Sequence, residues 1–530
     1  MLKKLVKIAV ICYISRMEFD IENLPESSEE LKNIILHLNK SLYQTQGEIA
    51  SYKKKYATLL EEIRLAKQQR FAPKSEKNIL QPDMFDEAGV ELPEEVKEQL
   101  VDEVEVKSHI RKKHPVRRPL PDYLPREIVL HDISEADKVC GCGEHLVRIG
   151  EEISEQLKYI PAQISVIQHV RPKYACRPCQ ENVKIASMPA LLLPKSIATP
   201  ELVAHVIISK YCDHLPLYRQ EAIWERMEVD MPRSSLCGWV LKTAELCEPL
   251  VNLLQKIIVV GEYAQADETT VQVLNEVGRD NCTKSYMWVY RCGGKHSSIV
   301  YEYQETRGGY HAQKFLSGFK GYLQSDAFSG YNWAHDAKDI IPVGCHAHAR
   351  RPFAELAKTN KTPGLAHEAL KFYRKLYAIE KEARDNELTP ESRYQLRQEK
   401  SVVILNAFKK WLDHHLAKTS EQGAIGKAIR YCLAHWVELN NYLKDGRVEI
   451  DNNLVENAIR PFALGRKNWL FNGSPAGAKA GAIFFSLIET CKANNVDPYH
   501  YLCVMLNRIR ECVTEDDYRK LLPQNINRHV

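Results

Sequence analysis

Three acidic residues lie where they could gather metal ions for phosphodiester chemistry. Asp267 comes just after the first strand of a predicted sheet, Asp326 lies at the end of its fourth strand, and Glu456 lies on a later predicted helix. Cleavage with two metals needs carboxylates gathered at one edge of a sheet, because the two ions clamp the attacking and leaving oxygens. Any single acid among the 69 is weak evidence. The strand order is what suggests a function for this set.

The helix that carries Glu456 is expected to begin after Asp451, which is a good N-cap residue. Asn452, Glu456 and Arg460 are spaced four residues apart, so they share one face of this helix. Pro461 is expected to end it. A glutamate with asparagine and arginine neighbours on one face is unusual for a surface that is only solvated.

Four cysteines in two close pairs form a second kind of candidate site. One residue separates Cys140 from Cys142, and two residues separate Cys176 from Cys179. Close pairs on tight turns let four thiolates complete the closed tetrahedral shell of a structural Zn²⁺ ion. The first pair is one residue short of the usual spacing, so His145 is an alternative ligand in place of Cys140 or Cys142. A redox pair and a coincidence of spacing remain open as other interpretations.

Composition excludes several classes of protein. The 530 residues are 44% hydrophobic, with 73 basic and 69 acidic residues and a formal net charge of +4. A wholly disordered or collagen-like chain is excluded, and the length predicts about three or four domains. The near-neutral sum argues against a small, uniformly basic nucleic-acid binder, but residues 81–107 are mainly acidic and residues 108–126 mainly basic. The basic stretch either follows phosphates or is a solvated linker.

Residues 27–69 repeat apolar side chains at alternating spacings of four and three, which predicts a coiled-coil seam and a partner helix. The alternative is an amphipathic helix docked on its own chain. We interpret residues 1–16 as an over-called extension before a start at Met17, with a targeting segment as the alternative. No apolar run reaches the roughly 18 residues of a membrane span.

Helices are expected over residues 218–227 and 232–246, and their short connection suits a helix-turn-helix. A tight helical hairpin without a DNA-binding role would give similar spacing. The second helix would offer polar side chains to a DNA groove, namely Arg233, Ser234, Ser235 and Lys242.

From residue 257 onward the pattern becomes rich in β-strands. A helix is expected over residues 311–319, between the third and fourth strands. The expected order is three strands, a helix, a strand, a helix and a strand, which is the order of a ribonuclease-H-like α/β core. A long helical segment then separates the last strand from Glu456. The strands are expected over residues 259–264, 286–292, 297–303, 322–324 and 340–343.

Together with these motifs, the sequence resembles the insertion sequence 66 family of bacterial DDE transposases from about Met17 to its C-terminus. The resemblance is densest over residues 266–269 with 287–290, residues 323–332 with 344–351, and residues 445–471. It implies a multidomain α/β protein, and the extension over residues 1–16 has no counterpart in the family. The expected parts, in order, are a coiled coil (27–69), a charged linker (70–126), a zinc module (127–194), a helix-turn-helix-like region (195–250), a ribonuclease-H-like core in two parts (257–346 and 445–475) around a helical insertion (347–444), and a C-terminal helical region (476–530).

The resemblance further implies that Asp267, Asp326 and Glu456 are the catalytic triad and bind two divalent ions, Mg²⁺ or Mn²⁺. It implies terminal inverted repeats of DNA as substrate, together with small accessory proteins of the same element. A homodimer or higher oligomer through the coiled coil and a bacterial, nucleoid-associated cytoplasmic location are expected. Two other functions are alternatives to a transposase. One is a ribonuclease-H-like nuclease without strand transfer, and the other is a catalytically inactive transposase-derived DNA-binding protein.

Residues near the triad are candidates for contacts to DNA. Bidentate arginine suits a phosphate, and an aromatic ring could stack on an unpaired base. Packing in the core is an equal alternative for the ring. Two histidines either orient water or support their helix, and we favour support. The phosphate candidates are Arg460, Arg466 and Lys467, the ring is Trp469, and the histidines are His346 and His348.

Overall fold

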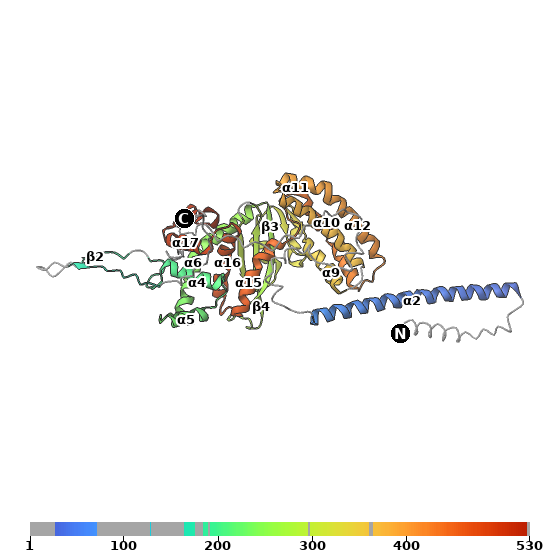
Figure 1. The fold of residues 1–530 in the computed structure, drawn as a ribbon, viewed down its shortest axis with the longest axis horizontal. Coiled ribbons are helices and arrows are strands. Elements are labelled where there is room, and N and C mark those ends of the chain that lie inside the picture. Colours follow the sequence, from blue (N-terminus) through green and yellow to red (C-terminus); the bar gives the residue numbers. More distant parts are fainter. Residues whose placement is uncertain are drawn as a thin grey trace, which may run out of the picture. The chain divides into compact units, whose positions relative to one another are not determined.

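The computed structural model is a mixed α/β structure in two compact units, Met1–Val96 with Ala190–Val530, and Lys97–Pro189 (Figure 1). No helix among its described residues is long and apolar enough to cross a membrane. The described residues are 27–71, 128, 164–174, 184–188, 191–294, 297–359 and 364–526.

A five-stranded mixed sheet lies in the larger unit, in the order β5-β4-β3-β6-β7. β3, β4 and β5 pair antiparallel, whereas β6 and β7 run parallel to β3. The carboxyl ends of the three parallel strands therefore meet at one edge. The strands are β3 (Tyr263–Gln272), β4 (Lys284–Cys292), β5 (Ile299–Gln304), β6 (Gly321–Gln324) and β7 (Ile340–Val343).

Helix α16 (Pro475–Ala493) covers the edge strand β5 with hydroxyl groups as well as apolar side chains. The backbone N–H of Tyr301 donates to Ser486 Oγ at 2.8 Å, and the N–H of Ile299 donates to Thr490 Oγ1 at 3.0 Å. These bonds satisfy backbone groups that an open edge would leave unpaired. The C-terminal helices thus complete the sheet.

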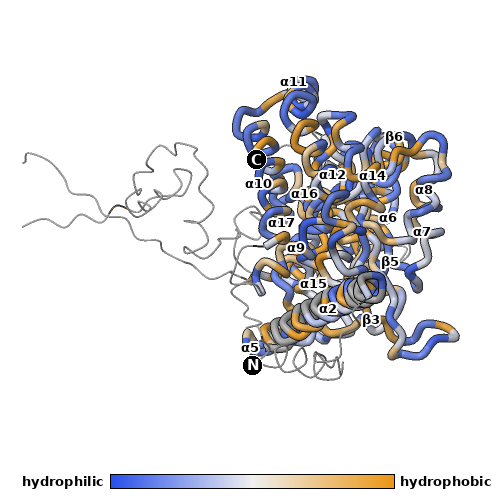
Figure 2. Tube along the Cα trace, turned by 90° about the vertical axis from the view of Figure 1, so that its right-hand side faces the viewer, coloured by the Kyte–Doolittle hydropathy of each residue, from blue (hydrophilic) through white to orange (hydrophobic). Residues whose placement is uncertain are grey.

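A helical insertion occupies the chain between β7 and the helix of Glu456. Its own core is built on Phe353, Tyr373 and Phe408, which are all fully buried. Hydrophobic and hydrophilic residues alternate along these helices, as amphipathic packing requires (Figure 2). The insertion contains α9 (His346–Thr359), α10 (Leu365–Asp385), α11 (Pro390–Leu396), a π-helical turn (Arg397–Ser401), α12 (Val402–Leu416), α13 (Ala424–Ala434) and α14 (Trp436–Asn440).

Three helices lie directly before the sheet, and Thr199 caps the first by accepting a hydrogen bond from the N–H of Leu202. The other helices are two short ones between the strands, the helix that carries Glu456 and two near the C-terminal end. These elements are α4 (Pro200–Tyr211), α5 (Leu217–Arg226), α6 (Arg233–Val260), α7 (Gly309–Phe315), α8 (Trp333–Asp336), α15 (Asn453–Trp469), α17 (Pro498–Arg508) and α18 (Glu515–Lys520).

The N-terminal segment forms one continuous helix, α2 (Ser28–Phe71). Helix formation agrees with the heptad pattern, while its pairing with another helix stays a prediction. In the smaller unit, β1 (Lys173–Tyr174) pairs antiparallel with β2 (Lys184–Ile185). The predicted zinc ligands Cys140, Cys142, Cys176 and Cys179, the alternative ligand His145, residues 1–16 and residues 72–126 lie outside the described residues.

Several sequence-based boundaries were wrong. The helix predicted over residues 232–246 continues to Val260, and the helix predicted over residues 311–319 ends at Phe315. Residues Val259 and Val260 end helix α6 rather than begin a strand, because the amphipathic pattern of α6 continues through buried Leu254 and Ile258. As a result the first strand starts later, and Asp267 lies inside β3 rather than after it. Helix α15 also continues past Pro461 to Trp469.

The packing of α16 gives a stability prediction. Phe485 is fully buried and its ring lies 5.3 Å from that of Tyr211, 5.5 Å from that of Tyr301 and 5.4 Å from that of Phe462. Phe485→Ala should lower the free energy of unfolding by about 3–5 kcal/mol, because a large cavity remains. Urea unfolding measures it. Val513→Ala, at an exposed site, should change it by no more than about 0.5 kcal/mol.

Candidate active site

The candidate carboxylates Asp267 and Asp326 lie at matching distances along the chain from a residue pair of the neighbouring parallel strands β3 and β6. β3 and β6 pair with Gln265 opposite Gln324, so each aspartate lies two residues beyond a paired glutamine. Asp267 Oδ1 accepts a hydrogen bond from the N–H of Glu268 at 2.7 Å. Asp326 Oδ1 accepts one from the N–H of Phe328 at 3.1 Å. The register therefore brings the two side chains to one edge of the sheet.

The electrostatics at Asp267 show that acidic groups converge there. Burial raises the pKa of Asp267 well above its usual value, and the neighbouring carboxylates of Glu268, Glu456 and Asp326 raise it further. Like charges held together in a partly buried place oppose ionisation. A divalent cation would offset this repulsion, so the oxygen donor set fits Mg²⁺ or Mn²⁺.

Glu268 has a different environment from Asp267, since successive residues of a strand face opposite sides of the sheet. Its carboxylate pairs with Arg307 at 2.6 Å and accepts a hydrogen bond from Tyr331 at 3.0 Å. The guanidinium of Arg307 lies 3.7 Å from the centre of the Phe328 ring. These contacts neutralise Glu268 and anchor the loop that carries Asp326.

Glu456 lies in the first turn of α15 and faces two basic side chains of α9. Its Oε1 is 3.5 Å from His348 Nδ1, and its Oε2 is 3.9 Å from the guanidinium of Arg351. The side chain is 27% exposed, so solvent reaches the carboxylate. The structure thus places Glu456 near Asp267 and the start of α9.

Asn452, rather than Asp451, is the N-cap residue of α15. Asn452 Nδ2 donates to the carbonyl of Ala266 at 3.2 Å, directly before Asp267. Asp451 still satisfies the first turn by accepting from the N–H of Asn453 at 3.1 Å, and it accepts from Tyr377 Oη at 2.9 Å. Burial raises the pKa of Asp451 to about 6. The start of the Glu456 helix is therefore bonded to the strand that carries Asp267.

Two fully buried glutamines hold the chain that enters α15. Gln324 Oε1 accepts from Gln265 Nε2 at 2.9 Å and from Tyr263 Oη at 2.5 Å. Gln324 Nε2 donates to the carbonyl of Glu449 at 2.9 Å, and Gln265 Nε2 to that of Asp451 at 3.2 Å. Sequence reasoning missed these residues, although a repeated Gln-x-Asp pattern precedes both aspartates.

The helical insertion reaches the same entering segment through buried ion pairs. Arg397 is fully buried and pairs with Glu380 at 2.8 Å, while donating to the carbonyl of Val448 at 2.8 Å. Arg393 bridges Glu380 at 2.6 Å and Glu449 at 2.7 Å. The insertion thus fixes the backbone just before the Glu456 helix.

The candidate DNA contacts near the triad fall into two groups. Arg466 donates to Thr269 Oγ1 at 3.0 Å and to the carbonyl of Thr270, so it binds β3. Trp469 packs beside Tyr211, with the ammonium of Lys210 4.8 Å from its ring centre. That contact agrees with the packing alternative. Lys467, by contrast, is exposed and Arg460 half-buried.

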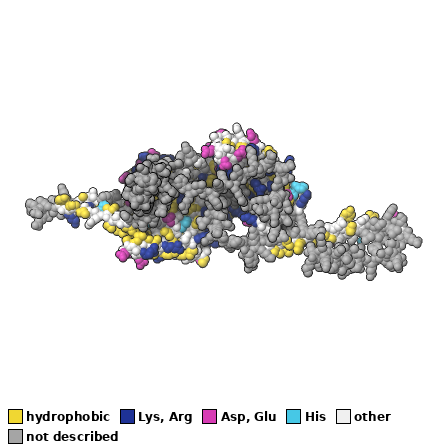
Figure 3. Space-filling view, in the orientation of Figure 1, with side chains coloured by type: hydrophobic (Ala, Val, Ile, Leu, Met, Phe, Trp, Pro, Cys, Tyr) yellow, Lys and Arg dark blue, Asp and Glu magenta, His cyan; other side chains and the backbone are white. Residues whose placement is uncertain are grey.

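The helix-turn-helix candidates lie on the surface. Arg233, Ser234 and Lys242 are all exposed along α6, and the backbone N–H of Arg233 donates to Glu221 of α5 at 2.6 Å. Figure 3 shows Lys and Arg side chains among hydrophobic ones where Figure 1 places α5. Acidic side chains, among them Glu221 and Glu225 of α5, lie on the same stretch, so its charge is mixed.

Of the two candidate histidines, His346 supports the fold. It is fully buried, and its Nε2 lies 2.8 Å from the carbonyl oxygen of Leu439, while its backbone N–H donates to Ile450. Burial lowers the pKa of His346 to about 4. His348 instead faces Glu456.

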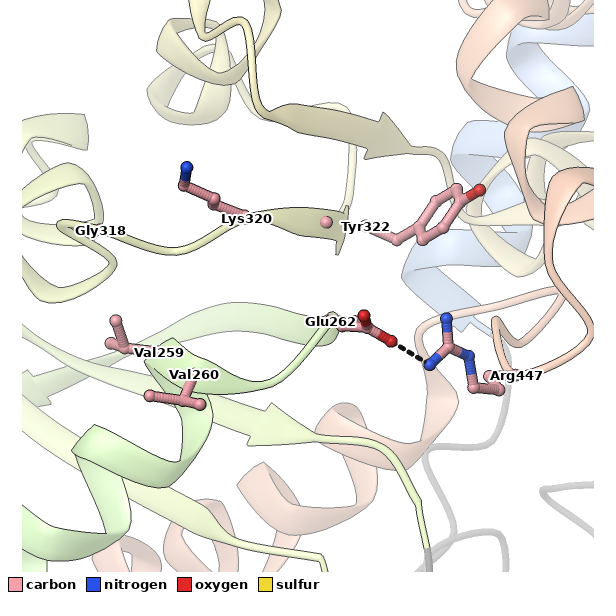
Figure 4. A pocket seen from close by; sticks show the side chains of 8 residues that line it. Val259, Val260, Glu262, Gly318, Lys320, Tyr322 and Arg447 are labelled. Atoms are coloured by element: carbon pink, nitrogen blue, oxygen red, sulfur yellow. Dashed lines mark hydrogen bonds and ion pairs between the residues drawn. The ribbon is translucent and has the colours of Figure 1, made fainter.

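A hollow at the other ends of the strands lies away from the carboxylates. Figure 4 shows Glu262 paired with Arg447 at one side of it, facing Lys320 and Tyr322. Glu262 and Tyr322 lie at the amino-terminal ends of β3 and β6, whereas Asp267 lies in the middle of β3 and Asp326 lies two residues past the carboxyl end of β6. A second hollow is lined by Asp326 itself.

Four family models match parts of this chain. The model described as the transposase IS66 family matches residues 195–480, and the zinc-finger binding domain of transposase IS66 matches residues 137–180. The IS66 C-terminal element matches residues 486–524, and the model described as transposase C of IS166 homeodomain matches residues 58–129. The zinc-finger match covers all four paired cysteines.

Curated relatives come from Sinorhizobium fredii. Uncharacterized protein y4hP is 35% identical over 427 residues, which cover 77% of this chain and 76% of that protein. Uncharacterized protein y4qI is 36% identical over 411 residues, covering 75% of each chain. Uncharacterized protein y4jD is 34% identical over 420 residues, covering 77% of this chain and 81% of that protein.

The buried imidazole of His346 predicts acid sensitivity. Folding keeps this side chain neutral, whereas the unfolded chain takes up a proton below about pH 6.5, so acid favours unfolding. Stability should be full above that pH and fall by up to about 3 kcal/mol as pH drops toward 4. In His346→Gln this part of the pH dependence should disappear, as measured by urea midpoints at pH 7.5 and 4.5. Exposed His414→Gln should keep it.

Proposed function

The chain belongs to the transposase IS66 family, and we propose that it cleaves DNA at the ends of an insertion sequence and joins those ends to target DNA. The observation that carries the proposal is the convergence of Asp267, Asp326 and Glu456 at one edge of the sheet. The carboxylates of Asp326 and Glu456 are close enough to Asp267 to contribute to its raised pKa. The strand order, with three antiparallel strands followed by two parallel ones, supports a ribonuclease-H-like core.

Asp267, Asp326 and Glu456 would hold two divalent cations, Mg²⁺ or Mn²⁺. When bound, these cations activate water and stabilise charge on the attacking and leaving oxygens. Asp267 and Asp326 supply oxygens from adjacent strands, while α15 supplies Glu456 from a separate element. The three carboxylates come from separate parts of the chain, so their distances depend on how these parts are packed together. The buried contacts to the segment before α15 serve this purpose.

The reaction balances without a covalent bond to protein. Water attacks the phosphorus at the element end, the bond from phosphorus to the 3′ oxygen breaks, and a 3′-hydroxyl and a 5′-phosphate result. That 3′-hydroxyl then attacks a target phosphodiester in line, losing its proton as the target strand's own 3′ oxygen leaves. Each step exchanges one phosphorus–oxygen bond for another.

Other parts of the chain would bind and arrange the DNA. Residues 195–250 would read it through α6, and Arg460 and Lys467 would contact phosphates near the scissile bond. Structural Zn²⁺ would be held by the cysteines at 140, 142, 176 and 179, within the matched zinc-finger segment. Residues 27–69 would join two copies, and small proteins of the same element would assist.

Loss of one triad carboxylate should abolish metal-dependent cleavage. Asp267→Asn and Glu456→Gln should each slow end cleavage in Mg²⁺ by more than about 100-fold, which exceeds the loss caused by removing an outer-shell partner. A labelled DNA duplex that carries the element end measures the rate. DNA affinity of each variant is measured beside it.

Glu355→Gln, at an exposed position of α9, is the matched control and should cleave like wild type. Wild-type cleavage by either triad variant would overturn the assignment. Joining of a pre-cleaved end to plasmid DNA separates a transposase from a nuclease without strand transfer. Binding with no metal-dependent cleavage by wild type would favour the inactive DNA-binding protein.

The exposed α6 surface predicts a salt effect. Lys242→Ala and Arg233→Ala should each weaken DNA binding and reduce the slope of log affinity against log salt by about 1, since each removes one phosphate contact. Fluorescence anisotropy at several salt concentrations measures that slope. Lys320→Ala, beside the hollow in Figure 4, removes an exposed positive charge elsewhere and should leave the slope unchanged.

A further inference from the structure

Beside the triad lies a group of side chains with different donor chemistry. One ligand atom each from Cys345, His348 and Glu456 lies within 4.8 Å of the other two. Cys345 directly precedes α9, His348 lies in its first turn, and Glu456 lies in the first turn of α15. Cys345 and His348 are three residues apart, so one helical turn brings them to the same side. Three donors thus converge from two helix starts.

These helix starts are bonded directly to each other, so the group does not depend on a flexible loop. The N–H of Asn452 donates to Cys345 Sγ at 3.2 Å, which orients the sulfur toward α15. The N–H of His346 donates to the carbonyl of Ile450 at 3.2 Å. Cys345 is only 2% exposed, whereas the side chains of His348 and Glu456 are 23% and 27% exposed. An ion would approach from the histidine and carboxylate side.

The donor set selects a particular class of cation. Sulfur, imidazole nitrogen and one carboxylate oxygen suit Zn²⁺ or Cd²⁺, and three protein ligands leave a fourth position for water. Mg²⁺ prefers six oxygen ligands and has little affinity for sulfur. The acidic groups around Asp267 also favour a cation nearby, whereas the guanidinium of Arg351, 3.9 Å from Glu456, opposes one. Coordination to the sulfur would have to outweigh that arginine.

We propose that Cys345, His348 and Glu456 form a binding site for a thiophilic divalent cation, Zn²⁺ or Cd²⁺. Occupation of this site draws Glu456 toward α9 and withdraws it from the two aspartates. Zn²⁺ is then an inhibitor of the Mg²⁺-dependent reaction, because its site and the proposed Mg²⁺ site share the ligand Glu456. The binding rests on the geometry and donor chemistry of these three residues, while the inhibition rests on the proposed function.

The test is a titration of the full chain with Cd²⁺. Two quantities are measured: the ultraviolet charge-transfer absorption of cadmium–thiolate bonds, and the number of metal ions that remain bound after dialysis. Other cysteines bind Cd²⁺ as well, so the comparison is between variants. Cys345→Ser and His348→Ala should each bind one Cd²⁺ fewer per chain than wild type at the same free Cd²⁺. Both variants should also lose the cadmium–thiolate absorption of this site, because Cys345 forms no bond to cadmium when the site is empty. Cys237→Ala, an exposed cysteine on α6, should keep this metal ion.

Equal Cd²⁺ binding by wild type, Cys345→Ser and His348→Ala would overturn the proposal. Circular dichroism checks that each variant is folded. Because His348 is half-exposed, His348→Ala keeps the test decisive if replacement of the buried Cys345 disturbs folding.

Inhibition of cleavage is measured separately, as the ratio of cleavage rates with and without Zn²⁺ in excess Mg²⁺. That ratio should rise toward 1 in Cys345→Ser. An unchanged ratio would overturn inhibition, and a chain that never cleaves would overturn the proposed function while the metal count still stands.

Discussion

The arrangement of the candidate site depends on a buried pair of amides between β3 and β6. Gln265 and Gln324 are opposite each other in the register and fully buried, and each also binds a carbonyl of the segment that enters α15. A buried amide without partners is costly, so these side chains hold that segment at one distance from the sheet. Since each lies two residues before an aspartate, the same bonds set the distance from Glu456 to Asp267 and Asp326.

The helical insertion strengthens this constraint from the other side. Burying Arg397 and Glu380 would be unfavourable if either lacked its partner, and the guanidinium also satisfies backbone carbonyls of the entering segment. Arg393 then ties Glu380 to Glu449, whose carbonyl is bound by Gln324. Insertion and sheet therefore meet on the same short stretch of backbone. A long insertion at this place in the chain acts as a support for the third carboxylate.

Much of this could be predicted because strand order and turn residues are local signals. The strand at residues 340–343 was predicted without error, and the positions of Asp326 and Glu456 on their elements were predicted correctly. The errors came from tertiary contacts that override local preference. Val259 and Val260 favour strands, yet they complete a helix whose inner face is already buried. The seam of residues 27–69 predicted α2, but a single chain does not show what pairs with it.

Pro461 explains why the basic residues beyond it were harder to assign. A proline usually ends a helix because it lacks an N–H and crowds the preceding turn. Here α15 continues, since Phe462 and Trp469 pack against Phe485 and outweigh the lost bond. Continuation turns Arg466 onto the threonines of β3 and leaves Lys467 exposed, although both are equally basic. Charge alone therefore cannot identify a phosphate contact, and the exposed side of this helix is where DNA would have to approach.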